Sequence, residues 1–385
     1  MIKFDTIHPF PARMAPELAY QELLKQNGTS NFVDPFCGSG TVPKIISQYE
    51  HTVYGFDIDP LAILMTRVWT TKVDLEIVRR RCDRIIAEIK KKNDVYLPWI
   101  DNDSETKDFI DFWFVEPQLS SLRSLSFLIS ESDDKVQQVL KLALSRIIIT
   151  KKKGASLGGD ISHSRPHRIR KTNDFDVISE YKKSVDTLCK KLSKIDIKGN
   201  VRIEFGDARQ INLDDEVADA VVTSPPYLNA IDYLRGHRLS LVWLGYNISY
   251  LRELRSNSIG SERKSVLAND LLDLRQNIGE ISKLDLKQQG FINRYLQDMF
   301  YSSKEITRIM KRGGKAIFVI GNSCLKGEFI KNDQALINAC QKCGLELLSK
   351  KTRELPPNRR YLPPPSIAID GPQRMREESI LTFAK

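Results

Sequence analysis

The chain has 385 residues, of which 41% are apolar and 28% are charged, so its composition is that of a folded globular protein. It is longer than one compact domain usually needs, and we expect one large core with insertions or two domains. The net charge of +10 favours a polyanionic partner, although a solvated basic surface would give the same surplus. Neither a secretory N-terminus nor a run of about 18 apolar residues is present, which predicts a cytoplasmic protein without membrane contact.

The N-terminal part of the chain predicts a strand, a glycine-rich turn and a helix. An apolar run at 31–36 stops at the turn 37–41, and apolar residues then recur at helical spacing. A second strand at 51–57 leads into a helix at 61–69. These segments form a βαβ unit.

Five further strand patterns return later in the chain. They lie at 200–205, 218–223, 315–321, 344–349 and 378–384. With the first two strands they predict an α/β fold, a doubly wound, mostly parallel, seven-stranded Rossmann-like sheet.

Residues 71–198 interrupt the alternation of strands and helices. Long helical patterns, such as the one at 120–149, predict an inserted helical subdomain without strands. The sheet domain then comprises 1–70 and 199–385, with a smaller charged and serine-rich insertion at 246–286 that predicts a helical lobe or a flexible arm. The proline-rich segment 355–376 predicts an extended loop.

Six cysteines are scattered along the chain, and only Cys340 and Cys343 have the spacing of a metal-binding pair. No second Cys or His pair completes a tetrahedral zinc site. We therefore expect reduced thiols and no metal.

The first strand and its turn predict a cofactor site. A glycine-rich turn before a helix presents unpaired N–H groups to the carboxylate or phosphate of a ligand, and Gly38 and Gly40 form such a turn. Asp57 follows about 20 residues later, where comparable folds place a carboxylate that binds ribose hydroxyls. The pair indicates an adenosine-containing cofactor and leaves nicotinamide, flavin and S-adenosylmethionine open. The alternative is a tight turn with Asp57 as a helix cap.

Ser224-Pro225-Pro226-Tyr227 begins where the buried strand 218–223 ends, the edge at which open α/β sheets gather ligands. The Ser224 hydroxyl and the Pro225 carbonyl could accept both N–H groups of an aromatic amine, which favours a pyramidal, attacking nitrogen. Tyr227 could stack on a base rotated out of a duplex. A polyproline-like turn without chemistry is the alternative.

In this order the motifs resemble those of the amino-methyltransferases of DNA. Residues 34–41 are similar to that family's first cofactor motif, residues 8–18 to the segment before it, and 206–208 to its adenine-contacting acid. The resemblance implies S-adenosylmethionine as the cofactor and direct methyl transfer to a base amine. The cofactor-binding residues that it implies are His8, Pro9, Asp34, Phe36, Gly38, Ser39, Gly40, Thr41, Asp57, Ile58 and Asp207. The catalytic residues are Ser224, Pro225, Pro226 and Tyr227.

Asp207 has a structural alternative, because an Asp after a strand commonly caps a turn or helix.

The choice of target base follows from the catalytic motif. The chain contains no Pro-Cys dipeptide, which disfavours carbon-5 cytosine methylation through a cysteine nucleophile. Family members with serine at the first motif position commonly modify cytosine N4, and those with Asp or Asn more often modify adenine N6. The resemblance therefore favours cytosine N4.

The segment 151–171 carries seven Lys or Arg against one Asp and is predicted to contact phosphates, with a solvated loop as the alternative. Asn229 is predicted to border the base pocket, with a helix cap there as the alternative. Arg359 and Arg360 are further candidates for contact with nucleic acid. The predicted nucleic-acid contacts are Lys151, Lys152, Lys153, Arg165, Arg168, Arg170, Asn229, Arg359 and Arg360.

The predicted partner is double-stranded DNA with a flipped base, together with cognate restriction or defence proteins, and the protein is expected to be a monomer or homodimer. The family's usual target-recognition domain does not follow the catalytic half, so recognition would come from the insertions. Two other functions stay open. They are an RNA base-amine methyltransferase, for example at guanine N2 of tRNA or rRNA, and a non-catalytic nucleic-acid-binding relative.

Overall fold

The structure is a computed structural model. It describes residues 6–10, 14, 17, 21, 28–89, 95–150, 153–159, 166–228, 232–261, 264–354 and 377–385.

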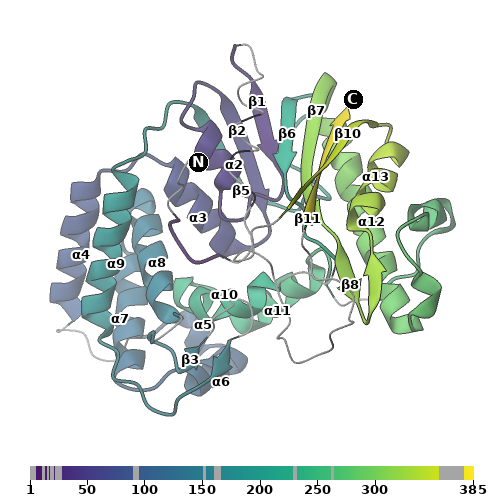
Figure 1. The fold of residues 1–385 in the computed structure, drawn as a ribbon. Helices are drawn as coiled ribbons and strands as arrows, with labels where there is room; N and C mark the ends of the chain where they lie inside the picture. The colour runs from purple at the N-terminus through teal and green to yellow at the C-terminus, as the bar shows by residue number, and fades with distance from the viewer. Residues whose placement is uncertain are drawn as a thin grey trace.

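A seven-stranded sheet forms the centre of one half of the molecule (Figure 1), in the order β10-β11-β7-β6-β1-β2-β5. The five strands from β5 to β7 are parallel, and β11 runs antiparallel to β7 and β10. All seven predicted strands are present, so the predicted fold class is confirmed. Their bounds are Asn31–Asp34 (β1), Thr52–Asp57 (β2), Asn200–Phe205 (β5), Ala218–Thr223 (β6), Met310–Gly321 (β7), Glu346–Glu354 (β10) and Glu377–Ala384 (β11).

Side chains that alternate along the central strands fill two cores, one on each face of the sheet. Phe32 and Val222 pack with the helix α2 (Thr41–Ile46) on one face. Val33 and Val221 pack with α12 (Leu286–Ile309) and α13 (Asn332–Lys342) on the other. Burial on both faces explains why β1 and β6 are nearly continuous apolar runs.

The sheet changes winding direction between β1 and β6. The chain continues from β1 to β2 on one side and from β6 to β7 on the other, and Val33 is paired with Val221. The carboxyl ends of β1 and β6 therefore lie side by side at a topological switch point, where open α/β sheets bind ligands.

The segment 71–198 is largely helical and stands beside the sheet in Figure 1. The predicted pattern at 120–149 is two helices, because Asp133 caps the second one by accepting a hydrogen bond from Lys135 N. The prediction of no strands was wrong, since a short pair occurs at Gly158–Gly159 (β3) and His167–Arg168 (β4). The helices are Leu75–Ile89 (α4), Pro98–Asp101 (α5), Ser104–Trp113 (α6), Gln118–Ser130 (α7), Asp134–Ile148 (α8) and Val177–Leu192 (α9).

These helices share a hydrophobic core with α3 (Pro60–Thr70) and α10 (Tyr233–Leu241), two helices that the sequence places in the sheet domain. Hydrogen bonds cross the same interface, from Ser126 Oγ to Trp243 O at 2.9 Å and from Trp99 Nε1 to Val242 O at 2.8 Å. Trp243 is 1% exposed and belongs to this core. The domain boundaries stay a prediction.

The segment 246–286 contains α11 (Ile248–Asn257) and two 3₁₀ turns, η2 (Asn269–Arg275) and η3 (Ile281–Lys283). A β-hairpin of β8 (Ser323–Leu325) and β9 (Glu328–Ile330) follows β7. Within the described ranges, no helix has the length and apolar character that a bilayer crossing requires.

Candidate functional site

The two predicted motifs meet at the carboxyl edge of β1 and β6. Asp34, the last residue of β1, accepts a hydrogen bond of 2.6 Å from the hydroxyl of Thr223, the last residue of β6. Both side chains are buried, and burial raises the pKa of Asp34 to about 7. The same carboxylate accepts from the backbone N–H of Phe36 at 3.2 Å. Asp34 thus joins the glycine turn to the strand that leads into the catalytic motif.

The turn after β1 requires glycine. Gly38 and Gly40 have φ values of 49° and 80°, in the left-handed region that favours glycine. A Cβ on Gly40 would lie 2.7 Å from Thr66 Oγ1 and 3.0 Å from Thr66 Cα. The turn is therefore a close-packed cradle in which a larger residue cannot replace Gly40. Ser39 is half-buried in this turn, and Thr41 is the first residue of α2.

Asp57 at the end of β2 holds the turn from the other side. Its carboxylate accepts from Gly38 N at 2.8 Å and from Asp59 N at 2.9 Å. Burial and the nearby Asp59 raise the pKa of Asp57 to about 7. The cap of α3 is Asp59, which accepts from Leu61 N at 2.9 Å, so Asp57 does not cap that helix. Ile58 lies half-buried between the two acids.

The segment before β1 covers the glycine turn. The ring of Phe10 lies 3.4 Å from where a Cβ on Gly38 would be, and it stacks on Tyr233 with ring centroids 4.9 Å apart. His8 Nδ1 lies 2.7 Å from the carbonyl oxygen of the next residue, Pro9. The described part of the segment therefore sits on the turn that the resemblance assigns to the cofactor.

A buried pair links this region to α10. His237 Nδ1 lies 2.5 Å from Asp59 Oδ2, and both side chains are almost fully buried. Site roles for Tyr233, His237 and Asp59 were not predicted, since their contacts join segments far apart in the chain. Phe10 was predicted only as part of the segment 8–18. The aromatic and histidine residues at 233 and 237, one helical turn apart, were the available signal.

Asp207 follows β5 and is engaged in a local ion pair. It accepts from Arg209 N at 2.9 Å, and its carboxylate lies 2.5 Å from Arg209 Nη2. Arg209 also pairs with the buried Asp298 at 2.7 Å. This arrangement favours the alternative in which Asp207 caps a turn, and a cofactor contact by Asp207 stays a prediction.

Strand β7, helix α12 and strand β11 hold the predicted catalytic turn, Ser224–Tyr227, which follows β6. Ser224 Oγ donates to Val319 O of β7 at 2.9 Å and also lies within hydrogen-bonding reach of the Tyr227 hydroxyl, and its lone pairs can accept. The Pro226 carbonyl accepts from the hydroxyl of Tyr295 of α12 at 3.2 Å. The Pro225 carbonyl takes no hydrogen bond from any residue that the structure describes. The two acceptors that the sequence predicts at Ser224 and Pro225 are thus available.

The phenol of Tyr227 points to β11. It donates to Glu378 Oε1 at 3.3 Å, and Glu378 is held by Arg353 of β10 at 2.5 Å. Burial and the neighbouring Glu378 raise the pKa of Tyr227 well above its usual value. The ring is therefore neutral and fixed at its hydroxyl end. Glu378 was not predicted, since it lies 151 residues from Tyr227 in the sequence.

The predicted nucleic-acid contacts are only partly described. Arg168, Ile169, Arg170 and Lys171 line a hollow of about 440 Å³ on the helical insertion. The Arg168 guanidinium lies 5.1 Å from the ring centroid of Phe112. Lys153 pairs with Asp174, which weakens its case as a phosphate contact. Lys151, Lys152, Arg165, Asn229, Arg359 and Arg360 lie outside the described residues.

The N-cap of α10 is Asp232, whereas Asn229 lies outside the described residues. The Asp232 carboxylate accepts from Arg235 N at 3.1 Å. This cap fixes the start of the helix that carries Tyr233 and His237.

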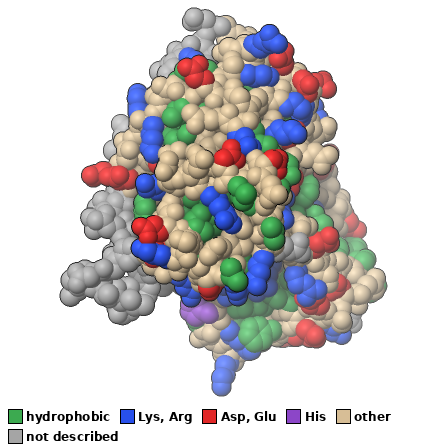
Figure 2. Space-filling view, turned by 90° about the vertical axis from the view of Figure 1, so that its right-hand side faces the viewer, with side chains coloured by type: hydrophobic (Ala, Val, Ile, Leu, Met, Phe, Trp, Pro, Cys, Tyr) green, Lys and Arg blue, Asp and Glu red, His purple; other side chains and the backbone are tan. Residues whose placement is uncertain are grey.

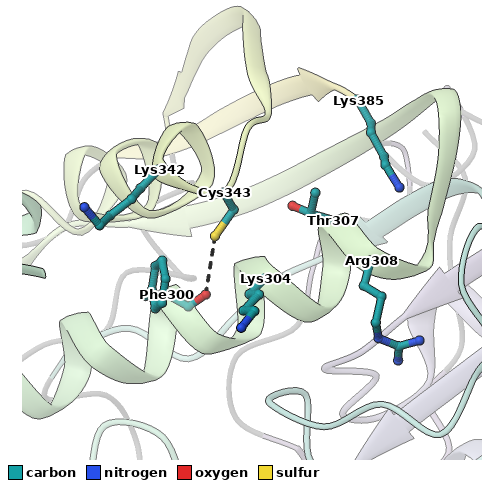
Figure 3. A pocket seen from close by; sticks show the side chains of 7 residues that line it. All are labelled: Phe300, Lys304, Thr307, Arg308, Lys342, Cys343 and Lys385. Atoms are coloured by element: carbon teal, nitrogen blue, oxygen red, sulfur yellow. Dashed lines mark hydrogen bonds between the residues drawn. The ribbon is translucent and has the colours of Figure 1, made fainter. Parts of the chain in front are cut away.

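A second hollow, of about 360 Å³, lies at the opposite edge of the sheet (Figure 3). The hollow lies where β7 begins, because Lys385, one of its lining residues, donates from Nζ to the carbonyl of Met310, the first residue of β7. Its lining is Phe300, Lys304, Thr307, Arg308, Lys342, Cys343 and Lys385. It is separate from the edge at which the two motifs meet.

Comparison with known proteins gives relatives over most of the chain. The type II methyltransferase M.MvaI of Kocuria varians is 27% identical over 91% of this chain and 84% of its own length. The type II methyltransferase M.AvaI of a Nostoc species is 24% identical over 82% of this chain and 73% of its own. The chain is similar to type II methyltransferases. This similarity confirms the methyltransferase resemblance drawn from the motifs.

Among solved structures, a SAM-dependent methyltransferase from Methanosarcina mazei is 10% identical and covers 95% of this chain and 96% of its own, with a TM-score of 0.34. No model of a protein family matches the chain.

Proposed function

We propose that the protein transfers a methyl group from S-adenosylmethionine to an exocyclic amino group of a base in DNA, with cytosine N4 preferred over adenine N6. The observation that carries the proposal is the bond between Asp34 and Thr223, which brings the glycine turn and the Ser224–Tyr227 turn to one switch point. The type II methyltransferase relatives support DNA as the substrate. Cytosine N4 rests on Ser224 at the first position of the motif.

The residues around the glycine turn suit this cofactor. The turn of Gly38 and Gly40, which would lie against the cofactor, is held by the close packing of Gly40 on Thr66 of α3. Asp57 would accept from ribose hydroxyls, and His8, Pro9 and Phe10 would cover the methionine end. When bound, S-adenosylmethionine supplies an electrophilic methyl group on its sulfonium.

The catalytic turn prepares the amine. Ser224 Oγ, whose own proton is donated to Val319, accepts one N–H of the amine, and the Pro225 carbonyl accepts the other. Both bonds favour a nitrogen lone pair that is free to attack. Tyr227 stacks on the base after it leaves the duplex. No covalent bond between the enzyme and the base is needed.

Labelled S-adenosylmethionine offered to separate pools of DNA and RNA tests the proposal. We expect label in DNA, and Ser224→Ala should reduce transfer by about 10²- to 10³-fold, as for the loss of one preorganised hydrogen-bonding group. Tyr227→Ala should also abolish transfer, whereas Tyr227→Phe should retain most of it because the ring remains. All three should bind the cofactor normally, and Asp57→Ala should bind it weakly.

Ser256→Ala, at a half-buried position on α11, serves as the matched control for Ser224→Ala. Label found only in RNA would contradict DNA methylation, and label in neither pool would favour a non-catalytic relative. Full activity of Tyr227→Ala would refute the stacking role. The proposal also includes cognate restriction proteins as partners and a monomeric or homodimeric state.

A further inference from the structure

The β8–β9 hairpin stands beside the proposed catalytic turn. It follows β7 directly at the carboxyl edge of the sheet. Ser323 of the hairpin donates to the carbonyl of Leu228 at 2.5 Å, and Leu228 comes next after Tyr227. Any nucleic acid whose base enters this site must therefore pass close to the hairpin.

The hairpin is braced on two sides. Asn332 Nδ2 donates to Gly321 O at 2.9 Å and to Ser323 Oγ at 2.7 Å. The Lys331 N–H donates to Ile278 O at 2.8 Å, which ties the hairpin to the 246–286 segment. These bonds fix its base relative to the catalytic turn.

At the tip of the hairpin, Lys326 adopts a backbone conformation that is unfavourable for a lysine. Lys326 and Gly327 have φ values of 52° and 94°, as in the two-residue turns that prefer Asn-Gly or Gly-Gly. A lysine in the left-handed region costs stability, and such strain commonly marks functional positions. Lys326 and Lys331 are both exposed, and neither forms an ion pair with a residue in the described ranges.

The basic residues of the hollow in Figure 3 differ from the hairpin lysines, because most of them pair with acids. Arg308 there pairs with Asp215 and Glu305, Lys342 with Asp273, and Lys385 with Glu216. Internal acids thus balance most of its charge, and it lies at the edge of the sheet away from the motifs. The hairpin carries two lysines and one acid, Glu328, and within the described residues neither lysine forms an ion pair.

We infer that the β8–β9 hairpin binds the sugar–phosphate backbone of duplex DNA beside the base to be methylated, with Lys326 and Lys331 each contacting a phosphate. This inference rests on the proposed function. Figure 2, which views the right-hand side of Figure 1, shows Lys and Arg side chains scattered over that face. Phe329, 45% exposed on β9, adds an apolar surface between the two lysines.

The salt dependence of binding to a fluorescent, random-sequence DNA duplex tests the inference, because the phosphate contribution does not depend on base sequence. Each lost phosphate contact should reduce the slope of log affinity against log salt by about 1. We expect this for Lys326→Asn and for Lys331→Gln, and a reduction of about 2 for the double variant. The exposed Lys304→Gln, at the opposite edge, should leave the slope unchanged.

Lys326→Asn separates binding from folding. Asparagine tolerates the left-handed backbone, so the thermal stability of this variant should equal or exceed that of the wild type while its DNA binding weakens. An unchanged salt slope in the double variant would overturn the inference. Methylation of DNA by the wild type, measured in parallel, distinguishes that result from a failure of the proposed function, in which the wild type neither binds nor methylates the duplex.

Discussion

The buried carboxyl group of Asp34 has a pKa of about 7 in the folded protein, raised by burial, against about 3.9 in an unfolded chain. Between these two values the folded state binds the proton more strongly than the unfolded state. The Asp34 contribution to the free energy of unfolding therefore falls as pH rises from about 4 to about 7, and is constant above. At neutral and alkaline pH, ionisation of this group opposes folding.

Asp34→Asn tests this dependence. The amide oxygen can still accept from Thr223 and Phe36, but the group no longer ionises. Relative to the wild type, the variant should gain stability between pH 5 and pH 8, measured by thermal denaturation at both values. A difference in melting temperature that does not change with pH would contradict the assigned pKa. The exposed Asp270→Asn is the control and should show no such gain.

At the residue scale, the sequence predicts the groups whose role lies in a local motif. Asp34, Gly40, Asp57 and Ser224 all follow directly from strand ends and a turn. Glu378 could not be predicted, because its contact with Tyr227 depends on the pairing of distant strands. The same holds for His237, whose partner Asp59 is 178 residues away in the sequence.

Helix α10 follows the proposed catalytic turn and contacts the segment that covers the glycine turn. Tyr233 in its first turn stacks on Phe10, which lies over Gly38. Such an aromatic pair contributes about 0.5–1.5 kcal/mol beyond area burial. Tyr233→Ala should therefore weaken S-adenosylmethionine binding by about 2- to 12-fold, as measured by calorimetry.

Tyr250→Ala is the matched control for this experiment. Tyr250 also stacks on another ring, but that ring is Tyr246 rather than Phe10, and Tyr250 lies on α11. Equal loss of cofactor affinity in both variants would show that general destabilisation, rather than the cover over Gly38, is responsible.

At the element scale, apolar runs predict the central strands β1 and β6, because burial on both faces leaves a strong pattern in the sequence. The outer strands β5 and β10 are largely exposed and show a weaker pattern. The pairs β3–β4 and β8–β9 were not predicted, since strands of two or three residues are too short to show a period. The break between α7 and α8 was missed because the cap at Asp133 interrupts a pattern that is apolar on both sides.

The whole molecule is stabilised by a core that joins the helical insertion to the sheet domain. Leu140 and Leu144 of α8 belong to the same buried cluster as Leu61 of α3 and Leu239 of α10. The sequence separates these regions at residue 71, because helical periodicity alone does not reveal which helices share a core. We expect the insertion and the sheet domain to unfold together.

Leu140→Ala tests this coupling, since removing a fully buried leucine side chain costs about 2–5 kcal/mol. The variant should lower a single unfolding transition, and S-adenosylmethionine should raise the whole of that transition. Leu348→Ala, on the exposed side of β10, should have little effect. Two separate transitions, of which the cofactor shifts only one, would contradict a shared core.

The identity of the methylated nucleoside tests the central claim most directly. DNA is incubated with the protein and S-adenosylmethionine carrying a deuterated methyl group, digested to nucleosides and analysed by mass spectrometry with authentic standards. The account predicts deuterated N4-methylcytosine in DNA from the wild type and about 10²- to 10³-fold less from Ser224→Ala. Label on carbon 5 of cytosine, or label in RNA alone, would contradict it.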